Sequence, residues 1–229
     1  MTMLSAEEIL ERMESEAPDE RLTLVPKPPL DVVASRAGTS IDLRLGRWFR
    51  AFKQTRTNSV ALIGAAPGPA APTESSRTKE HFVPFGESYV IHPGRFALGV
   101  TLEWLKLPGD LSGYVTGKSS LGRHGLVIET AAGLHPHFSG CLTLELANVG
   151  EVPLEIYPGM KICQIFLHRA RPQAARSRGA FSGRRKPALS PPDRNDPIFE
   201  RLLMDPFAPV AVMPDDDETA MEVDSEGED

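Results

Sequence analysis

Residues 142–147 read Leu142-Thr143-Leu144-Glu145-Leu146-Ala147, and a turn sequence, Asn148-Val149-Gly150, follows directly. Apolar and polar side chains alternate here with a period of two, which is typical of a β-strand with one buried face. The three leucines are therefore expected to face a core. Thr143 and Glu145 are expected on the opposite face, together with Cys141. This stretch predicts a β-rich fold with a lone carboxylate on the polar side of one strand.

Short apolar segments of the same kind occur on both sides of this stretch, and each is closed by proline or glycine. They are residues 88–91, 96–105 and 154–157, followed by turn sequences at 92–94, 107–110 and 158–159. Strands at this spacing favour an antiparallel sandwich or barrel. The alternation of residues 40–45 predicts a further strand. The 21 Pro and 19 Gly of the chain also disfavour a helical bundle.

The two ends of the chain differ from this β-rich middle. Ser5 and Glu8 have the spacing of a capping box, and apolar residues at helical spacing follow, which predicts a helix over residues 6–15. Residues 64–76 are rich in Ala, Pro, Gly and Ser and are expected to form a flexible loop. The strand pattern ends after Arg169, where five prolines mark an irregular C-terminal arm.

Composition and charge narrow the class of protein. The 229 residues carry a formal charge of −6, and nine acidic residues lie between Asp215 and Asp229, so the remaining body has a charge of +3. We expect the acidic tail to be a solvated, disordered end. We expect no membrane-spanning helix and no signal peptide, because the chain has no run of about 18 apolar residues and its first residues are acidic. Two cysteines are too few for a disulfide scaffold, so we expect a reduced, cytoplasmic protein.

The densest group of polar residues is Gly117-Lys118-Ser119-Ser120-Leu121-Gly122-Arg123. It reads as a turn and helix start that offers two hydroxyls, two cations and backbone N–H groups, a combination that suits phosphate oxygens. It lacks the spacing of a Walker A loop. The alternative interpretation is a Ser-capped turn with solvated Lys and Arg side chains. Taken alone, the segment favours this alternative.

Two other candidates are Glu145 and a histidine pair. A carboxylate in the mouth of a barrel can act as a general base, whereas the alternative is an exposed Glu on a solvated face. His135 and His137 have side chains that ligate metals, but no HExxH motif and no paired cysteines accompany them. Metal binding is therefore the weaker interpretation. A deamination here would proceed without zinc-bound hydroxide.

In this order, the segments resemble one family closely, the dCTP deaminases of the trimeric dUTPase-like superfamily. The resemblance spans roughly residues 20–185 and depends on many spaced motifs. These are Ser40–Gly46, Gly117–Arg123 with Gly125-Leu126, Thr130-Ala131, Pro136, Phe138–Gly140, Leu142–Leu146, Asn148–Gly150, Pro153-Leu154 and Pro158–Ile162.

The resemblance implies a mainly β fold, a distorted β-barrel (β-clip, dUTPase-like) with short helices and an irregular C-terminal arm. It also implies a homotrimer with active sites between subunits, and a hydrolase of pyrimidine deoxyribonucleotide metabolism that makes dUTP and ammonia from dCTP. No resident cofactor is implied, and Mg²⁺ would arrive on the triphosphate. Neither a nucleic acid polymer nor a membrane is an expected partner.

The family's site residues carry over to matching positions. Glu145 would shuttle protons, and Ser119, Arg123 and Ala131 would position the water and the ring. Nucleotide contacts are expected from Lys118, Ser119, Ser120, Leu121, Gly122, Arg123, Thr130, His135, Thr143, Leu144, Glu145, Gln173, Phe181 and Arg184. No protein metal ligand is expected.

Some positions depart from the family pattern. His135 stands where the family has an Asp near the sugar, and His137 stands where the motif usually ends in Gly. In the C-terminal arm, Gln173, Phe181 and Arg184 replace other residues. A bifunctional deaminase–dUTPase, a dUTPase and a regulatory nucleotide-binding trimer are therefore alternative functions. The expected division is an N-terminal helical segment (1–20), the barrel domain (21–170), a lid (171–190) and an extension with an acidic tail (191–229).

Overall fold

The computed structural model describes residues 2–29, 38–53, 77–129, 133–171, 182–189, 197–198 and 201. The chain divides into two compact units, Met1–Asn58 with Pro69–Ser190, and Ser59–Gly68 with Pro191–Asp229. The helices and strands named below all belong to the first unit. The predicted flexible loop at 64–76 lies outside the described residues.

The first unit contains two helices and twelve strands among its described residues. In chain order these are α1 (Ala6–Glu14), β1 (Thr23–Val25), β2 (Ser40–Arg44), β3 (Trp48–Phe52), β4 (Thr78–Phe82), β5 (Tyr89–Ile91), β6 (Phe96–Lys106), β7 (Leu111–Gly117), α4 (Ser119–Gly122), β8 (Leu126–Glu129), β9 (Gly133–Leu134), β10 (Ser139–Asn148), β11 (Leu154–Ile156) and β12 (Lys161–Arg169).

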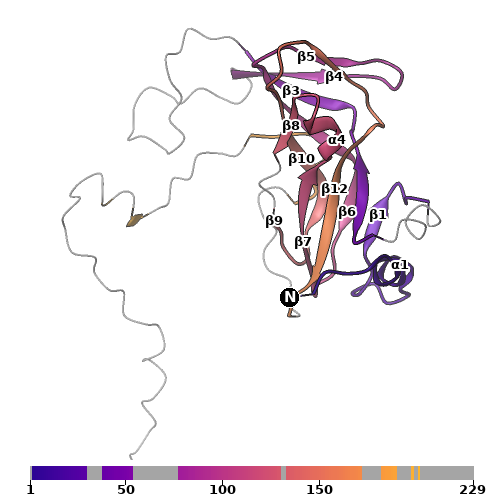
Figure 1. Ribbon diagram of the computed structural model, residues 1–229. Helices are drawn as coiled ribbons and strands as arrows, with labels where there is room; N and C mark the ends of the chain where they lie inside the picture. Colours follow the sequence, from indigo (N-terminus) through magenta and orange to yellow (C-terminus); the bar gives the residue numbers. More distant parts are fainter. Residues whose placement is uncertain are drawn as a thin grey trace, which may run out of the picture. The chain divides into compact units, whose positions relative to one another are not determined.

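All of these strands pair antiparallel, in three sheets (Figure 1). The largest sheet has the order β4-β3-β6-β10-β8, and β1 also pairs with β6. A second sheet has the order β2-β12-β7-β9, and β5 and β11 form a separate pair. Within the described ranges the sheets do not join into a closed ring, so the barrel is open.

The hydrophobic core is built from alternate residues of the long strands. On β10, Leu142, Leu144 and Leu146 are at most 3% exposed, whereas their neighbours are half-buried. Gly99 of β6 lies against this row, because a Cβ atom there would stand 2.9 Å from Leu146 Cδ1. Each fully buried leucine contributes about 1.5–3 kcal/mol. The alternation read from residues 142–147 is thereby confirmed.

Helix α1 begins as the sequence predicts. The Ser5 side chain accepts a hydrogen bond from the Glu8 N–H at 3.2 Å, and the Glu8 carboxylate accepts one from the Ser5 N–H at 2.8 Å. Ile9 is fully buried, and the Leu4 N–H donates to the carbonyl of Leu167 on β12 at 2.9 Å. The residues before the helix are therefore bonded to the second sheet, and in Figure 1 α1 lies at the β1 end of the unit.

The mainly β prediction is confirmed, and the strands predicted at 40–45, 88–91, 96–105, 142–147 and 154–157 correspond to β2, β5, β6, β10 and β11. The sequence analysis did not name the other seven strands, which are β1, β3, β4, β7, β8, β9 and β12. Among these, β3 and β4 form one edge of the largest sheet. Neither shows clean alternation. Both pair with a neighbour that is distant in sequence, β3 with β6 and β4 with β3. These two strands are therefore specified by their partners rather than by their own pattern.

Candidate active site

The polar segment at 117–123 forms the end of β7 and the short helix α4. Gly117 allows the end of β7 to approach β8 closely, because a Cβ atom at this position would lie 2.9 Å from Cβ of Ile128 on β8. Leu121 packs against the core and holds α4 in place. The hydroxyls of Ser119 and Ser120 and the Arg123 side chain are on exposed residues. The segment thus presents two hydroxyls and one guanidinium to solvent.

Lys118 is more restrained than the sequence suggested. It is the N-cap residue of α4, and its ammonium lies 2.6 Å from Oδ1 of Asp42 on β2. The other oxygen of Asp42, Oδ2, lies 3.0 Å from the ammonium of Lys161, at the start of β12. The alternative of a Ser-capped turn with a solvated lysine is therefore wrong: no serine caps α4, and Lys118 is in an ion pair.

The environment of Asp42 keeps its carboxylate ionised. Burial is the largest single influence and by itself raises the pKa of Asp42. The hydrogen bonds from Lys118 and Lys161 act in the opposite direction, and the net pKa is lowered. A half-buried carboxylate with two ammonium partners is a fixed negative charge at neutral pH.

Glu145 lies on the face of β10 that points away from the core. It is half-buried, and the register pairs it with Leu98 on β6 and with Glu129 on β8. Directly opposite residues of an antiparallel pair have Cβ atoms about 4.5–5.5 Å apart. Glu129 therefore lies beside Glu145. Thr143 shares this face, whereas the neighbouring side chain of Leu144 is fully buried, so only its backbone is near this surface.

The histidine pair lies in the turn between β9 and β10. Both His135 and His137 are exposed, and the Phe138 N–H donates to the His135 carbonyl at 3.1 Å. His137 has φ +64°, a left-handed conformation that favours glycine, and this is the position where the family motif usually has Gly. In the part of the chain that the structure describes, no group of three His, Cys, Asp or Glu side chains is placed to hold a metal ion.

Arg184 belongs to residues 182–189, which we call the strap. The Gly183 N–H donates to the Ser139 carbonyl at 2.7 Å, and the Cys141 N–H donates to the Arg184 carbonyl at 2.9 Å. The strap thus pairs with the first residues of β10. A Cβ atom on Gly140 would lie 3.3 Å from the Arg184 carbonyl oxygen, so a small residue there favours this approach.

Further along, the strap crosses to β3 and β4. Arg50 Nε donates to the Pro187 carbonyl at 3.1 Å, and the Lys186 ammonium lies 3.7 Å from the ring centroid of Trp48 and 3.3 Å from Oε2 of Glu80. Arg50 is paired with Leu98, the same residue that pairs with Glu145. The strap therefore lies on the face of the large sheet that carries Glu145.

The structure places the predicted site residues in separate groups. Lys118–Arg123 lie around α4, Thr143–Glu145 on β10, and Arg184 on the strap. His135 follows Leu134, which pairs with Gly113 on β7. Lys118 comes five residues after Gly113, a distance of about 16 Å along an extended chain. Thr130, Ala131, Gln173 and Phe181 lie outside the described residues. Among the described residues, these groups lie on different elements of the chain.

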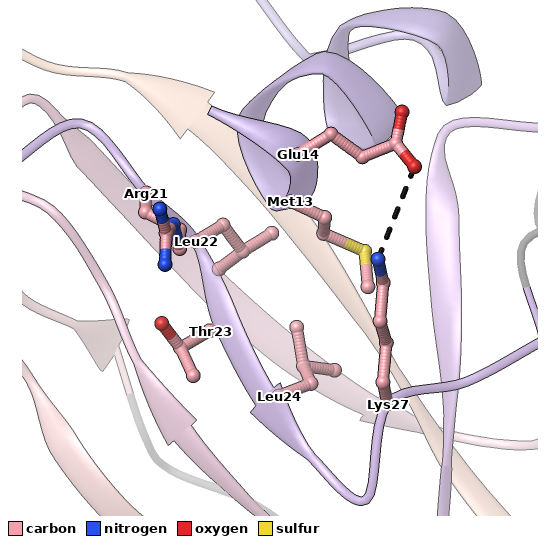
Figure 2. A pocket seen from close by; sticks show the side chains of 7 residues that line it. All are labelled: Met13, Glu14, Arg21, Leu22, Thr23, Leu24 and Lys27. Atoms are coloured by element: carbon pink, nitrogen blue, oxygen red, sulfur yellow. Dashed lines mark ion pairs between the residues drawn. The ribbon is translucent and has the colours of Figure 1, made fainter. Parts of the chain in front are cut away.

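Two hollows lie around α1, away from the predicted residues. One, of about 450 Å³, is lined by Met13, Leu22, Thr23, Leu24, Glu14, Arg21 and Lys27, and Figure 2 shows the Lys27–Glu14 ion pair at its rim. The other is lined by Arg12, Asp110, Arg169, Glu11, Ser15 and Glu20. None of the predicted site residues lines either hollow.

Sequence reasoning missed three charged residues close to the candidate site: Asp42, Lys161 and Glu129. Asp42 lies in the alternating strand at 40–45, whose pattern already placed its side chain on the polar face. That pattern contained the signal for an accessible carboxylate. The two ammonium groups that contact it come from distant parts of the chain, so the local sequence could not predict these ion pairs.

Neither cysteine is a candidate nucleophile. Both are free thiols. Burial raises the pKa of Cys141 to about 11 and that of Cys163 to about 12. A thiol must lose its proton to attack, so both are unreactive at neutral pH. Among the described residues, no helix is long and apolar enough to cross a membrane.

The protein is thus of the open antiparallel β class. It carries hydroxyls and cations around α4 and a half-buried carboxylate on β10, and the first of these groups suits an anionic ligand. The chain belongs to the dCTP deaminase-like family, whose sequence pattern matches residues 3–170. The family recognised from the sequence motifs is thus confirmed.

The chain is similar to 2′-deoxycytidine 5′-triphosphate deaminase from Agrobacterium tumefaciens, with 20% identity and a TM-score of 0.49 over 72% of this chain and 46% of that one. EIAV dUTPase matches with 20% identity and a TM-score of 0.34, over 41% of this chain and 78% of that one. A variant of the Staphylococcus bacteriophage 80alpha dUTPase matches with 18% identity and a TM-score of 0.34, over 43% and 81%. The chain spans less than half the length of the Agrobacterium protein that it matches.

Proposed function

We propose that the protein is a dCTP deaminase, which hydrolyses dCTP to dUTP and ammonia. The observation that carries this proposal is the position of Glu145, a half-buried carboxylate on the outward face of β10 in a chain of the dCTP deaminase-like family. The hydroxyls and cations around α4 support it, because they suit the phosphates of a nucleotide. Dissociable Mg²⁺ would enter as part of the substrate, bound to its triphosphate.

In the proposed reaction, water adds to C4 of the cytosine ring and the amino group leaves as ammonia. Glu145 takes a proton from the water as the C–O bond forms and delivers it to N3. The remaining hydroxyl proton then passes to the amino nitrogen as the C–N bond breaks. A positioned general base of this kind accelerates a reaction by about 10²–10⁴. Ser119, Arg123 and the backbone of Ala131 would hold the water and the ring.

The nucleotide is proposed to bind between copies of the chain in a homotrimer. In one chain His135, the α4 segment and Glu145 lie on separate elements. Neither hollow around α1 contains any of them. Contacts from Lys118, Ser120, Leu121 and Gly122 to the phosphates would then come from one subunit, and Thr130, His135, Thr143 and Glu145 would come from its neighbour.

The test is to incubate the purified protein with dCTP and Mg²⁺ and to follow the products by ion-exchange chromatography. The wild-type protein is expected to form dUTP. Glu145→Gln is expected to lower the rate by about 10²–10⁴. Because Gln keeps the shape of the side chain, dCTP should bind within a few-fold of the wild-type affinity.

The matched control is Glu87→Gln, which removes an exposed carboxylate in the loop between β4 and β5 and should leave turnover unchanged. Full turnover by Glu145→Gln would show that another group is the base. Formation of dUMP would add a diphosphatase activity. If the wild-type protein binds dCTP but leaves it unchanged, the regulatory alternative replaces the proposed function.

A further inference from the structure

Asp42 holds two lysine ammonium groups together beside α4. The three residues come from three elements: Asp42 from β2, Lys118 from the start of α4 and Lys161 from the start of β12. The backbone supports the arrangement, since the Lys118 N–H donates to the carbonyl of Ile162, the residue after Lys161, at 3.2 Å. The start of β12 therefore fixes both the backbone of Lys118 and the second cation next to it.

We propose that Asp42 is the positioning residue of a triphosphate-binding site in which Lys118 and Lys161 are the contacting cations. This inference rests on the proposed function only for the identity of the nucleotide. The geometry itself points to a polyphosphate. Two ammonium groups lie on the two oxygens of one carboxylate, so their separation is set by the protein before any ligand arrives.

The charges of the three groups explain why Lys161 is needed. Asp42 is ionised, because its two hydrogen-bonded cations outweigh the effect of burial on its pKa. If Asp42 paired with Lys118 alone, the pair would be neutral and would attract a phosphate only weakly. With Lys161 on the second oxygen, the three groups together carry one positive charge. Lys161 therefore offsets the negative charge of Asp42, so that the group keeps a net positive charge that attracts a phosphate.

Both ammonium groups can still reach a ligand. The side chains of Lys118 and Lys161 are 22% and 29% exposed, whereas that of Asp42 is 14% exposed. An ammonium has three N–H donors, so donors beyond those used by Asp42 remain for phosphate oxygens. The exposed hydroxyls of Ser119 and Ser120 begin α4 directly after Lys118. A chain of phosphates is thereby matched by two cations and two hydroxyls, whereas a single phosphate would use only part of this set.

The test compares two variants by isothermal titration calorimetry, with inorganic tripolyphosphate and with Mg-dCTP as the ligands. Lys161→Met should weaken the binding of both ligands about tenfold, since it removes one charge-assisted interaction. Asp42→Asn should also weaken binding, although it adds one positive charge. This second result separates positioning from charge: if only net charge mattered, Asp42→Asn would bind tripolyphosphate more tightly.

The matched control is Lys27→Met, which removes a lysine of a distant ion pair at α1 and should bind both ligands like the wild type. Lys161→Arg should recover most of the affinity, because it returns the cation. In steady-state assays Lys161→Met should raise KM for dCTP with kcat changed less than threefold, a split that general destabilisation would not produce. If Asp42→Asn does not fold, Lys161→Met and Lys161→Arg still carry the test.

The outcomes distinguish this inference from the proposed function. Wild-type affinity in Lys161→Met, or tighter binding by Asp42→Asn, overturns the inference even if dCTP is deaminated. Failure of the wild-type protein to bind tripolyphosphate and Mg-dCTP overturns it as well. Binding that is lost in both variants, in a protein that does not deaminate dCTP, supports the inference and contradicts the proposed function.

Discussion

Glu103 is a buried carboxyl that the proposed chemistry does not use. It is only 4% exposed, and its Oε2 accepts a hydrogen bond from the Arg44 N–H at 2.8 Å. Burial raises the pKa of Glu103, and the hydrogen bond from the Arg44 backbone offsets that effect only in part. In the folded protein, the ionised form of this residue is therefore destabilising at neutral pH.

Glu103→Gln is expected to stabilise the protein at neutral pH, because the amide oxygen can accept the same hydrogen bond without a charge. The wild-type carboxyl has a higher pKa when folded than when unfolded. Its protonated form therefore contributes stability below the unfolded pKa, and that contribution is lost as the pH rises through the folded pKa. The gain from the substitution should thus be largest at pH 7–8 and shrink towards pH 4. Denaturant unfolding at several pH values measures it.

The exposed Glu151→Gln, in the turn after β10, is the matched control and should show no such pH dependence. The free energy of unfolding of Glu103→Gln could instead differ from that of the wild type by the same amount at every pH. That result would show that the Glu103 carboxyl has the same pKa in the folded and the unfolded protein.

At the scale of elements, the strap determines what covers the outward face of the large sheet. Its backbone pairs with Ser139 and Cys141, and Lys186 lies between Trp48 and Glu80. Leu98 and Val100 are buried on β6, and Pro187 and Ala188 of the strap are buried as well. This packing explains why β6 is buried along most of its length rather than at alternate residues.

Lys186→Glu should release the strap, because it removes the contact with the Trp48 ring and places two carboxylates together. A cation–π contact and an exposed ion pair sum to about 1–2 kcal/mol, so hydrogen exchange of the Gly183 and Cys141 amides should accelerate about five- to thirtyfold. Mass-resolved or NMR-detected exchange measures these amides. The Ile9 amide in α1 serves as the internal reference.

Lys79→Glu is the matched charge reversal. Lys79 lies next to Glu80 on β4 but on the opposite side of the strand, so its reversal should leave both strap amides unchanged. Equal acceleration in the two variants would mean that net charge, and not the contact of Lys186, governs the strap.

At the scale of the whole molecule, the separation of the predicted residues leads to a prediction about assembly. Arg123 follows α4 after the second sheet, whereas Glu145 belongs to the large sheet. In the proposed homotrimer one subunit supplies Arg123 and its neighbour supplies Glu145. Arg123→Ala and Glu145→Gln should each be inactive alone, and light scattering should find particles of three 25.0 kDa chains.

Mixed trimers of these two variants should regain about one third of the wild-type rate, because a trimer that contains both variants has both native groups at one of its three interfaces. Co-expression with two affinity tags isolates the mixed particles for the deaminase assay. Trimers of each variant alone, purified in the same way, are the control. No recovery in verified mixed trimers would place Arg123 and Glu145 in the same chain's site.

Local sequence determined much of this protein. The alternation at 142–147 predicts β10 and its buried leucines, and the Ser5–Glu8 spacing predicts the cap of α1. These features are local because hydrogen bonding at a helix start and side-chain alternation act over a few residues. The positions of Ser119, Ser120 and Arg123 around α4, and of Glu145 on the outward face of β10, were predictable for the same reason.

Only the tertiary structure decided which charges meet. Lys118 and Asp42 are 76 residues apart in sequence, and Lys161, which reaches the same carboxylate, lies still further along the chain. The pairing of Glu129 with Glu145 depends on the register of β8 against β10, and the position of the strap depends on Trp48, Arg50 and Glu80 of two strands that the sequence did not reveal. Such contacts depend on strand order and register. These are set by burying the whole core at once, so no single segment encodes them.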